Sequence, residues 1–190
     1  MKKILLLLTF ILIAQTNFAR VTASTPYSRY LHSWNLISKL CSELTDNAEM
    51  IARRPDRVAV KGFAVNFNKK VGVLIVNQNN LINLITHQGF KDHHFPNTYR
   101  IMQQNLTDLE KILLNNRPFI DNLKLPNFNS AEIYNAIDFK AYENDELLRQ
   151  AEHNKRNKAF KRLVIDNLTQ GVILLNECRS KVAALYSKIK

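Results

Sequence analysis

Residues Tyr27–Ala52, which read YSRYLHSWNLISKLCSELTDNAEMIA, decide the fold of this 190-residue chain. Apolar side chains recur along this stretch at intervals of four and three residues, as on the buried face of a helix. They are Tyr30, Trp34, Ile37, Cys41, Leu44, Ala48 and Ile51. Serine, lysine, glutamate and aspartate occupy the other positions, so the pattern predicts an amphipathic helix. Arg53-Arg54-Pro55 ends it, because the residue before a proline avoids helical dihedral angles.

The next segment, from Asp56 to about Gln88, has the same helical spacing over its whole length. Its expected buried positions are Val60, Ala64, Phe67, Val71, Leu74, Gln78, Leu81 and Ile85. Residues 58–76 also fit a β-hairpin, because valines alternate with other residues on both sides of Asn68-Lys69-Lys70. The alternation covers only the middle of the segment, so we favour a helix.

Further helices are expected in the second half of the chain. Helical spacing returns from Asn97 to about Leu114, and an irregular stretch with two prolines follows from Arg117 to Phe128. Asn129 and Glu132 resemble a capping box at the start of a short helix. The last helix is expected to run from about Asn144 almost to the C-terminus. The fold class is therefore all-α: an antiparallel four- to five-helix bundle with long helices, its N- and C-terminal helices adjacent.

The N-terminus has the pattern of a secretory signal peptide. Lys2 and Lys3 precede an apolar run, Ile4–Ala14, that is too short to span a bilayer, which needs about twenty apolar residues. Val21-Thr22-Ala23 fits a cleavage site, so we predict a signal peptide at residues 1–23, one bundle domain at residues 24–190, and a secreted or periplasmic protein. We expect no transmembrane segment in the mature chain.

Two cysteines, Cys41 and Cys178, both lie on expected buried faces. If the first and last helices pack antiparallel, the cysteines lie about 21 and 18 Å from the paired helix ends, at nearly the same level. An exported protein meets an oxidising compartment, so we predict a Cys41–Cys178 disulfide. The alternative is a pair of buried free thiols.

Basic residues give the chain a formal charge of +11, which falls to about +8 without the signal peptide and favours anionic partners. The densest basic run holds the candidate binding residues Arg149, Lys155, Arg156, Lys158, Lys161 and Arg162. Aromatic residues do not alternate with them, so specific nucleic-acid recognition is not expected. The run is either a surface for an unknown protein or anionic surface, or simply a solvated face.

Motifs of known enzymes are missing: the sequence has no Gly-rich phosphate loop, no HExxH, no GxSxG and no CxxC. Asp92-His93-His94 could offer metal ligands, but a closed site needs three or four ligands with supporting contacts. We interpret this stretch as a solvated polar loop and expect no metal, no cofactor and no catalytic residues.

The sequence therefore predicts an exported, non-enzymatic binding protein that uses a basic helical surface. The alternative is a carrier that holds an apolar, lipid-like ligand inside the bundle. Its pocket would be lined by Trp34, Phe63, Phe67, Phe160 and Leu175. The same five residues are also expected in an ordinary core.

Overall fold

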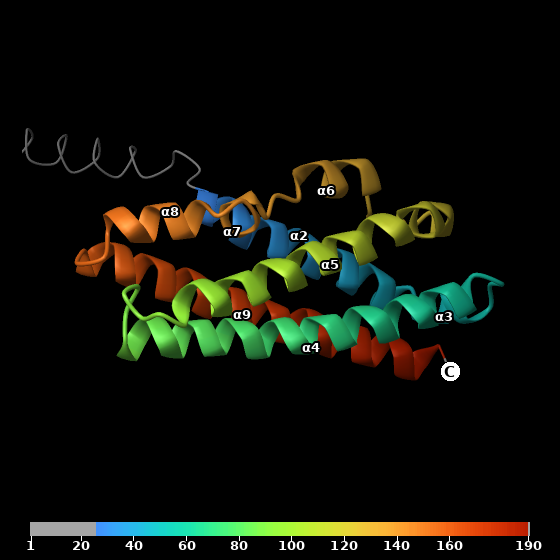
Figure 1. Ribbon diagram of the computed structural model, residues 1–190. Helices are drawn as coiled ribbons and strands as arrows, with labels where there is room; N and C mark the ends of the chain where they lie inside the picture. The colour runs from blue at the N-terminus through green and yellow to red at the C-terminus, as the bar shows by residue number, and fades with distance from the viewer. Residues whose placement is uncertain (1–25, 190) are drawn as a thin grey trace, which may run out of the picture.

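The computed structural model describes residues 26–189, and the predicted signal peptide lies outside this range (Figure 1). Within the range the chain is helical and has no strand, which confirms the all-α class. Four long helices form the body: α2 (Pro26–Asp46), α4 (Arg57–His87), α5 (Phe95–Leu123) and α9 (Lys158–Lys188). The short ones are α3 (Ala48–Ala52), α6 (Ser130–Ala136), α7 (Lys140–Glu143) and α8 (Glu146–His153).

The predicted apolar faces of the first two segments are buried without exception. Every expected position of α2 and α3, from Tyr30 to Ile51, lies in the core, and so does every expected position of α4, from Val60 to Ile85. Residues 58–76 are helical throughout, so the hairpin alternative is wrong. Burial of one continuous apolar face over 31 residues outweighs the weak helix propensity of the valines and glycines.

The helices pack in the order α2, α9, α4, α5, so the N- and C-terminal helices are adjacent as predicted. Their predicted antiparallel direction is wrong. Near the start of α2, the Asn167 side chain donates to the carbonyl of Tyr27 (2.9 Å), and near its end Thr45 donates to the carbonyl of Lys181 (2.9 Å). Residue numbers therefore rise together along both helices, which makes α2 and α9 parallel.

The parallel direction comes from a return path that the sequence analysis missed. The predicted single last helix is interrupted at residues 154–157, where the Asn157 side chain accepts from the backbone N–H of Phe160 (3.1 Å) and caps α9. Before that break, α6 and α7 pack against both α2 and α5, and the chain runs back along the bundle (Figure 1). As a result α9 begins at the same end as α2.

Helix α5 is longer than predicted and continues through Pro118 to Leu123. The expected loop from Arg117 to Phe128 is therefore wrong over its first half. Proline removes one helical hydrogen bond, but Ile120 and Leu123 continue the buried face of the helix, and their burial offsets that cost. The predicted capping box is confirmed in part, since the Asn129 side chain accepts from the backbone N–H of Glu132 (3.2 Å) at the start of α6.

A tyrosine cluster, made of Tyr27, Tyr30, Tyr99 and Tyr142, joins the long helices inside the core. The Tyr142 hydroxyl on α7 donates to Asn167 Oδ1 on α9 (2.6 Å), and the Tyr99 hydroxyl on α5 donates to the Tyr142 carbonyl (2.8 Å). Burial raises the pKa of the Tyr142 hydroxyl well above its ordinary value, so this hydroxyl remains a donor. Among the described helices, none has the length and apolar character needed to cross a bilayer.

Candidate functional site

The loop between α4 and α5 builds one wall of the candidate site. Gly89 turns the chain with a φ of 79°, a value that favours glycine. The buried rings of Phe90 and Phe95 then meet edge to face, with centroids 5.2 Å apart, and Phe90 also packs on Phe160 of α9 (5.5 Å). These rings anchor the loop, so the polar residues between them, 91–94, have a fixed backbone.

The other wall is the end of α8 together with the turn before α9. His153 is the last residue of α8, and its Nδ1 lies 2.8 Å from the carbonyl oxygen of Arg149. A carbonyl only accepts, so this contact places the ring proton on Nδ1 and leaves Nε2 as an acceptor. The exposed Lys155 and Arg156 follow in the turn.

The two walls enclose an open pocket of about 790 Å³. We call it the basic cleft. It is lined by Phe90, Lys91, Asp92, His93, Pro96, Glu152, His153, Lys155 and Arg156. Its charged residues are three cations, Lys91, Lys155 and Arg156, and two carboxylates, Asp92 and Glu152. Glu152 is paired with Lys155.

The structure brings only part of the predicted basic run to this cleft. Lys155 and Arg156 line it. Three other members contact protein groups of their own: Arg149 pairs with Glu146 (2.7 Å), Arg162 pairs with Asp166 (3.5 Å), and Lys161 donates to the carbonyl of Thr86 (2.9 Å). The sixth, Lys158, is exposed at the first position of α9.

Lys91 is the cation that sequence reasoning missed. It comes from the α4–α5 loop and lines the cleft beside residues more than sixty positions later in the chain. A single lysine in a loop carries no signal of its own in a chain with 27 Lys and Arg residues. Its role follows only from the packing of Phe90 against Phe160.

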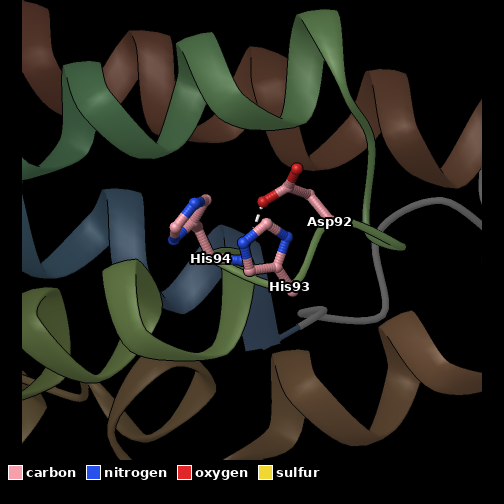
Figure 2. A group of neighbouring side chains, drawn as sticks. All are labelled: Asp92, His93 and His94. Atoms are coloured by element: carbon pink, nitrogen blue, oxygen red, sulfur yellow. Dashed lines mark hydrogen bonds between the residues drawn. The ribbon is translucent and has the colours of Figure 1, made fainter.

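Asp92, His93 and His94 form a compact polar group just before α5 (Figure 2), and Asp92 and His93 line the cleft. Their potential ligand atoms all lie within 4.8 Å of one another. The backbone N–H of His94 donates to Asp92 Oδ1 (2.7 Å), and the two imidazole centroids are 3.8 Å apart. Both histidines are exposed. Among the described residues, this is the group whose side chains are suitably placed for a metal ion.

The five residues predicted to line an apolar pocket do not gather in one place. Phe63 packs on Phe67 (5.3 Å), whereas Phe160 packs on Phe90 near the far end of α4. Trp34 lies against Phe139 (5.1 Å), and Leu175 is fully buried.

The two predicted disulfide partners do meet. Cys41 and Cys178 lie 4.3 Å apart, fully buried between α2 and α9, as free thiols. The neighbouring Cys178 thiol and burial hold the pKa of Cys41 well above its ordinary value, so little Cys41 thiolate exists in the folded protein. Tyr27 is hydrogen-bonded to Asn167, and Cys41 and Cys178 follow these two residues by 14 and 11 positions on parallel helices, so they reach nearly the same level although the predicted antiparallel geometry is wrong.

Comparisons of the chain with protein-family models, with curated proteins and with solved structures give no match. Function is therefore inferred from the chemistry of its own residues. In the basic cleft, exposed cations from two separate segments converge on one pocket. Such an arrangement is suited to holding an anionic group.

Proposed function

We propose that this protein is an exported, non-enzymatic binding protein whose basic cleft holds an acidic segment of a partner protein. The observation that carries the proposal is the convergence of Lys91 with Lys155 and Arg156 around one pocket. Carboxylates of the partner would enter the pocket and meet ammonium and guanidinium groups on two sides.

The existing ion pairs leave these cations available. Lys155 is paired with Glu152, but both side chains are substantially exposed, and exposed pairs are worth at most about 1 kcal/mol. A partner carboxylate therefore competes with Glu152 at little cost. Arg156 forms no ion pair with a described residue. The surplus of positive charge over the whole chain further speeds encounter with an acidic partner.

The test is binding of a fluorescent polyglutamate peptide, followed by anisotropy. Reversal of two cleft charges, in Lys91→Glu/Arg156→Glu, should weaken binding at least about tenfold, because each lost ion pair is worth about 1 kcal/mol in water-like surroundings. Raising the salt from 0.1 to 1 M should also weaken it, because the screening length falls from about 10 to about 3 Å.

The matched control is Arg53→Glu/Arg57→Glu, which changes the net charge by the same amount. Arg53 and Arg57 are exposed beside α3, at the end of the bundle opposite α8 (Figure 1). The control should keep most of the binding. Equal losses in both variants would mean that net charge alone attracts the peptide, and the cleft proposal would then be wrong.

We also propose that residues 1–23 direct export and that Cys41 and Cys178 become joined afterwards. In this oxidation each thiol loses a proton and an electron, and a small-molecule disulfide such as glutathione disulfide takes them up to give two glutathione thiols. Because both thiols are buried and the pKa of Cys41 is raised well above its ordinary value, oxidation is expected during folding rather than after it. The purified exported protein should be lighter than the reduced chain by two hydrogens and should begin near Ser24.

The alternative function, a carrier of an apolar ligand, is tested by measuring the mass of the same purified protein under native conditions. A native mass above that of the bare chain, lost on denaturation, would reveal a bound apolar ligand. A bare monomer would favour surface binding at the cleft.

A further inference from the structure

The end of the bundle that holds the basic cleft also carries side chains suited to binding a cation. The side chains of Asp92, His93 and His94 present a carboxylate and two imidazoles with ligand atoms no more than 4.8 Å apart (Figure 2). Around a tetrahedral ion with bonds of about 2.0–2.1 Å, neighbouring ligand atoms are about 3.3–3.4 Å apart. The ligand atoms therefore need to move by little more than an ångström, and the exposed histidine side chains can rotate by that amount.

The backbone beneath these side chains is already fixed. The carbonyl of Asp92 accepts from the N–H of Phe95 (3.1 Å), and Phe95 itself is buried. Asp92 Oδ1 is oriented by the N–H of His94, which leaves Oδ2 as the oxygen available to an ion. A hydrogen bond of this kind orients a ligating carboxylate in many metal sites.

His153 lies on the opposite wall of the cleft and is not one of the three residues whose ligand atoms lie within 4.8 Å of one another. It lines the same pocket as Asp92 and His93. Its Nδ1 faces the Arg149 carbonyl, so its Nε2 carries the free lone pair. Ligating histidines usually have this second contact, which fixes the tautomer and orients the ring.

We propose that Asp92, His93 and His94 bind a divalent transition-metal ion such as Zn²⁺, with His153 as the ligand from the opposite wall. Imidazole nitrogens select Zn²⁺, Cu²⁺ or Ni²⁺ over Mg²⁺ and Ca²⁺, which prefer oxygen ligands. The nearby cations Lys91, Lys155 and Arg156 repel the ion, so we expect micromolar rather than tighter affinity.

The experiment is calorimetric titration of the chain, without an added histidine tag, with ZnCl₂ at pH 7.5. Wild type should bind one ion. His93→Ala/His94→Ala should lose at least tenfold in affinity, and His153→Ala should lose several-fold. The control His32→Ala removes an exposed histidine of α2 and should change nothing. No binding by the wild type, or unchanged binding by the double variant, would overturn the proposal.

Two further measurements keep the result unambiguous. Circular dichroism melting checks that each variant is folded, and the visible absorption of bound Co²⁺ reports coordination directly. The variant Lys91→Glu/Arg156→Glu separates this proposal from the proposed function, since it removes repulsion from the ion. It should tighten Zn²⁺ binding while it weakens peptide binding, so either property can fail without the other.

Discussion

The tyrosine cluster and the basic cleft are polar regions built in opposite ways. In the tyrosine cluster, rings from α2, α5 and α7 are buried, and Asn167 of α9 both accepts from the Tyr142 hydroxyl and donates to the backbone carbonyl of Tyr27. In the basic cleft the three cations are exposed, and the ion pair that forms joins Glu152 and Lys155, which are three residues apart. Buried hydrogen bonds stabilise a fold because leaving them unmade is costly, whereas exposed charges are free to meet a partner.

The largest expected effect is that of Asn167→Ala. The substitution leaves the buried Tyr142 hydroxyl without its acceptor and removes one hydrogen bond to the Tyr27 carbonyl. An unpaired buried group costs about 1–3 kcal/mol and a lost hydrogen bond about 1 kcal/mol, so the free energy of unfolding should fall by about 3 kcal/mol. Urea denaturation measures it.

The control for Asn167→Ala is Asn176→Ala, on the same helix. Asn176 is exposed and donates only to the Val172 carbonyl of its own helix (2.9 Å). Because alanine is the better helix former, this control should be neutral or slightly stabilising. Equal destabilisation by both variants would mean that the hydrogen bonds of Asn167 do not hold the helices together.

A smaller effect is expected from Gly171→Ala, which tests how closely the cluster packs. A Cβ at this position would lie 3.0 Å from Tyr30 Cε1 and 3.1 Å from Gln78 Oε1, both fully buried. Overpacking costs about 1–3 kcal/mol and the gain in helix propensity is about 1 kcal/mol, so a net loss of up to about 2 kcal/mol is expected.

Gly62→Ala gives the matched control, because nothing lies within 4 Å of its added Cβ. It should raise the free energy of unfolding by about 0.5–1 kcal/mol. Thermal melting of the two variants compares them directly. A stabilised Gly171→Ala variant would show that the helices separate easily at the cluster.

The long helices were predictable because apolar residues recur every three or four positions over many turns. A single residue rarely changes such a pattern. The exceptions show what a local pattern omits. Pro118 suggested an end to α5, but burial of Ile120 and Leu123 overrides it. The interruption between α8 and α9 depends on side-chain hydrogen bonds of Asn154 and Asn157, which in an asparagine-rich chain carry little signal.

The candidate site was predictable only in part. Lys155 and Arg156 stand in the basic run and were identified, but Lys91 and the two walls depend on contacts between distant segments. The direction of α9 also required knowledge of the return path through α6–α8. The proximity of Cys41 and Cys178 was predicted from a wrong direction of α9, because the two residues lie at nearly the same level in the parallel pair as well.

Partly buried and ion-paired carboxylates should also differ in how the stability of the fold depends on pH. Burial, followed by the charges of Glu110 and Asp138, raises the pKa of Glu143 to about 7. The folded state therefore holds more protons than the unfolded state between pH 4.5 and 7, and stability from this group falls as the pH rises through that window. Glu143→Gln removes the penalty. Because Glu143 is only half-buried, a gain of about 1 kcal/mol at pH 8 and little change near pH 4.5 are expected.

Glu177→Gln should have the opposite sign. Lys181 and Ser38 donate to its carboxylate and lower the pKa of Glu177. Its stabilisation is present above the unfolded pKa and is lost as the pH falls through the lowered value. This variant should therefore be destabilised at neutral pH and match wild type in acid. Urea denaturation between pH 4 and 8 measures both variants, and identical pH profiles would contradict the assignment.

The smallest effects on stability are expected from substitutions of exposed arginines in and near the basic cleft. Arg156 lines the pocket, whereas Arg162, in the same basic run, lies outside it and pairs with Asp166. Arg156→Ala and Arg162→Ala should both leave Tm unchanged, because neither side chain is buried. Arg156→Ala should weaken polyglutamate binding about fivefold, the worth of one ion pair of about 1 kcal/mol, and Arg162→Ala should change it less than about twofold. Should Arg162→Ala weaken binding as much as Arg156→Ala, the contact surface would follow the outer face of α9 rather than the cleft.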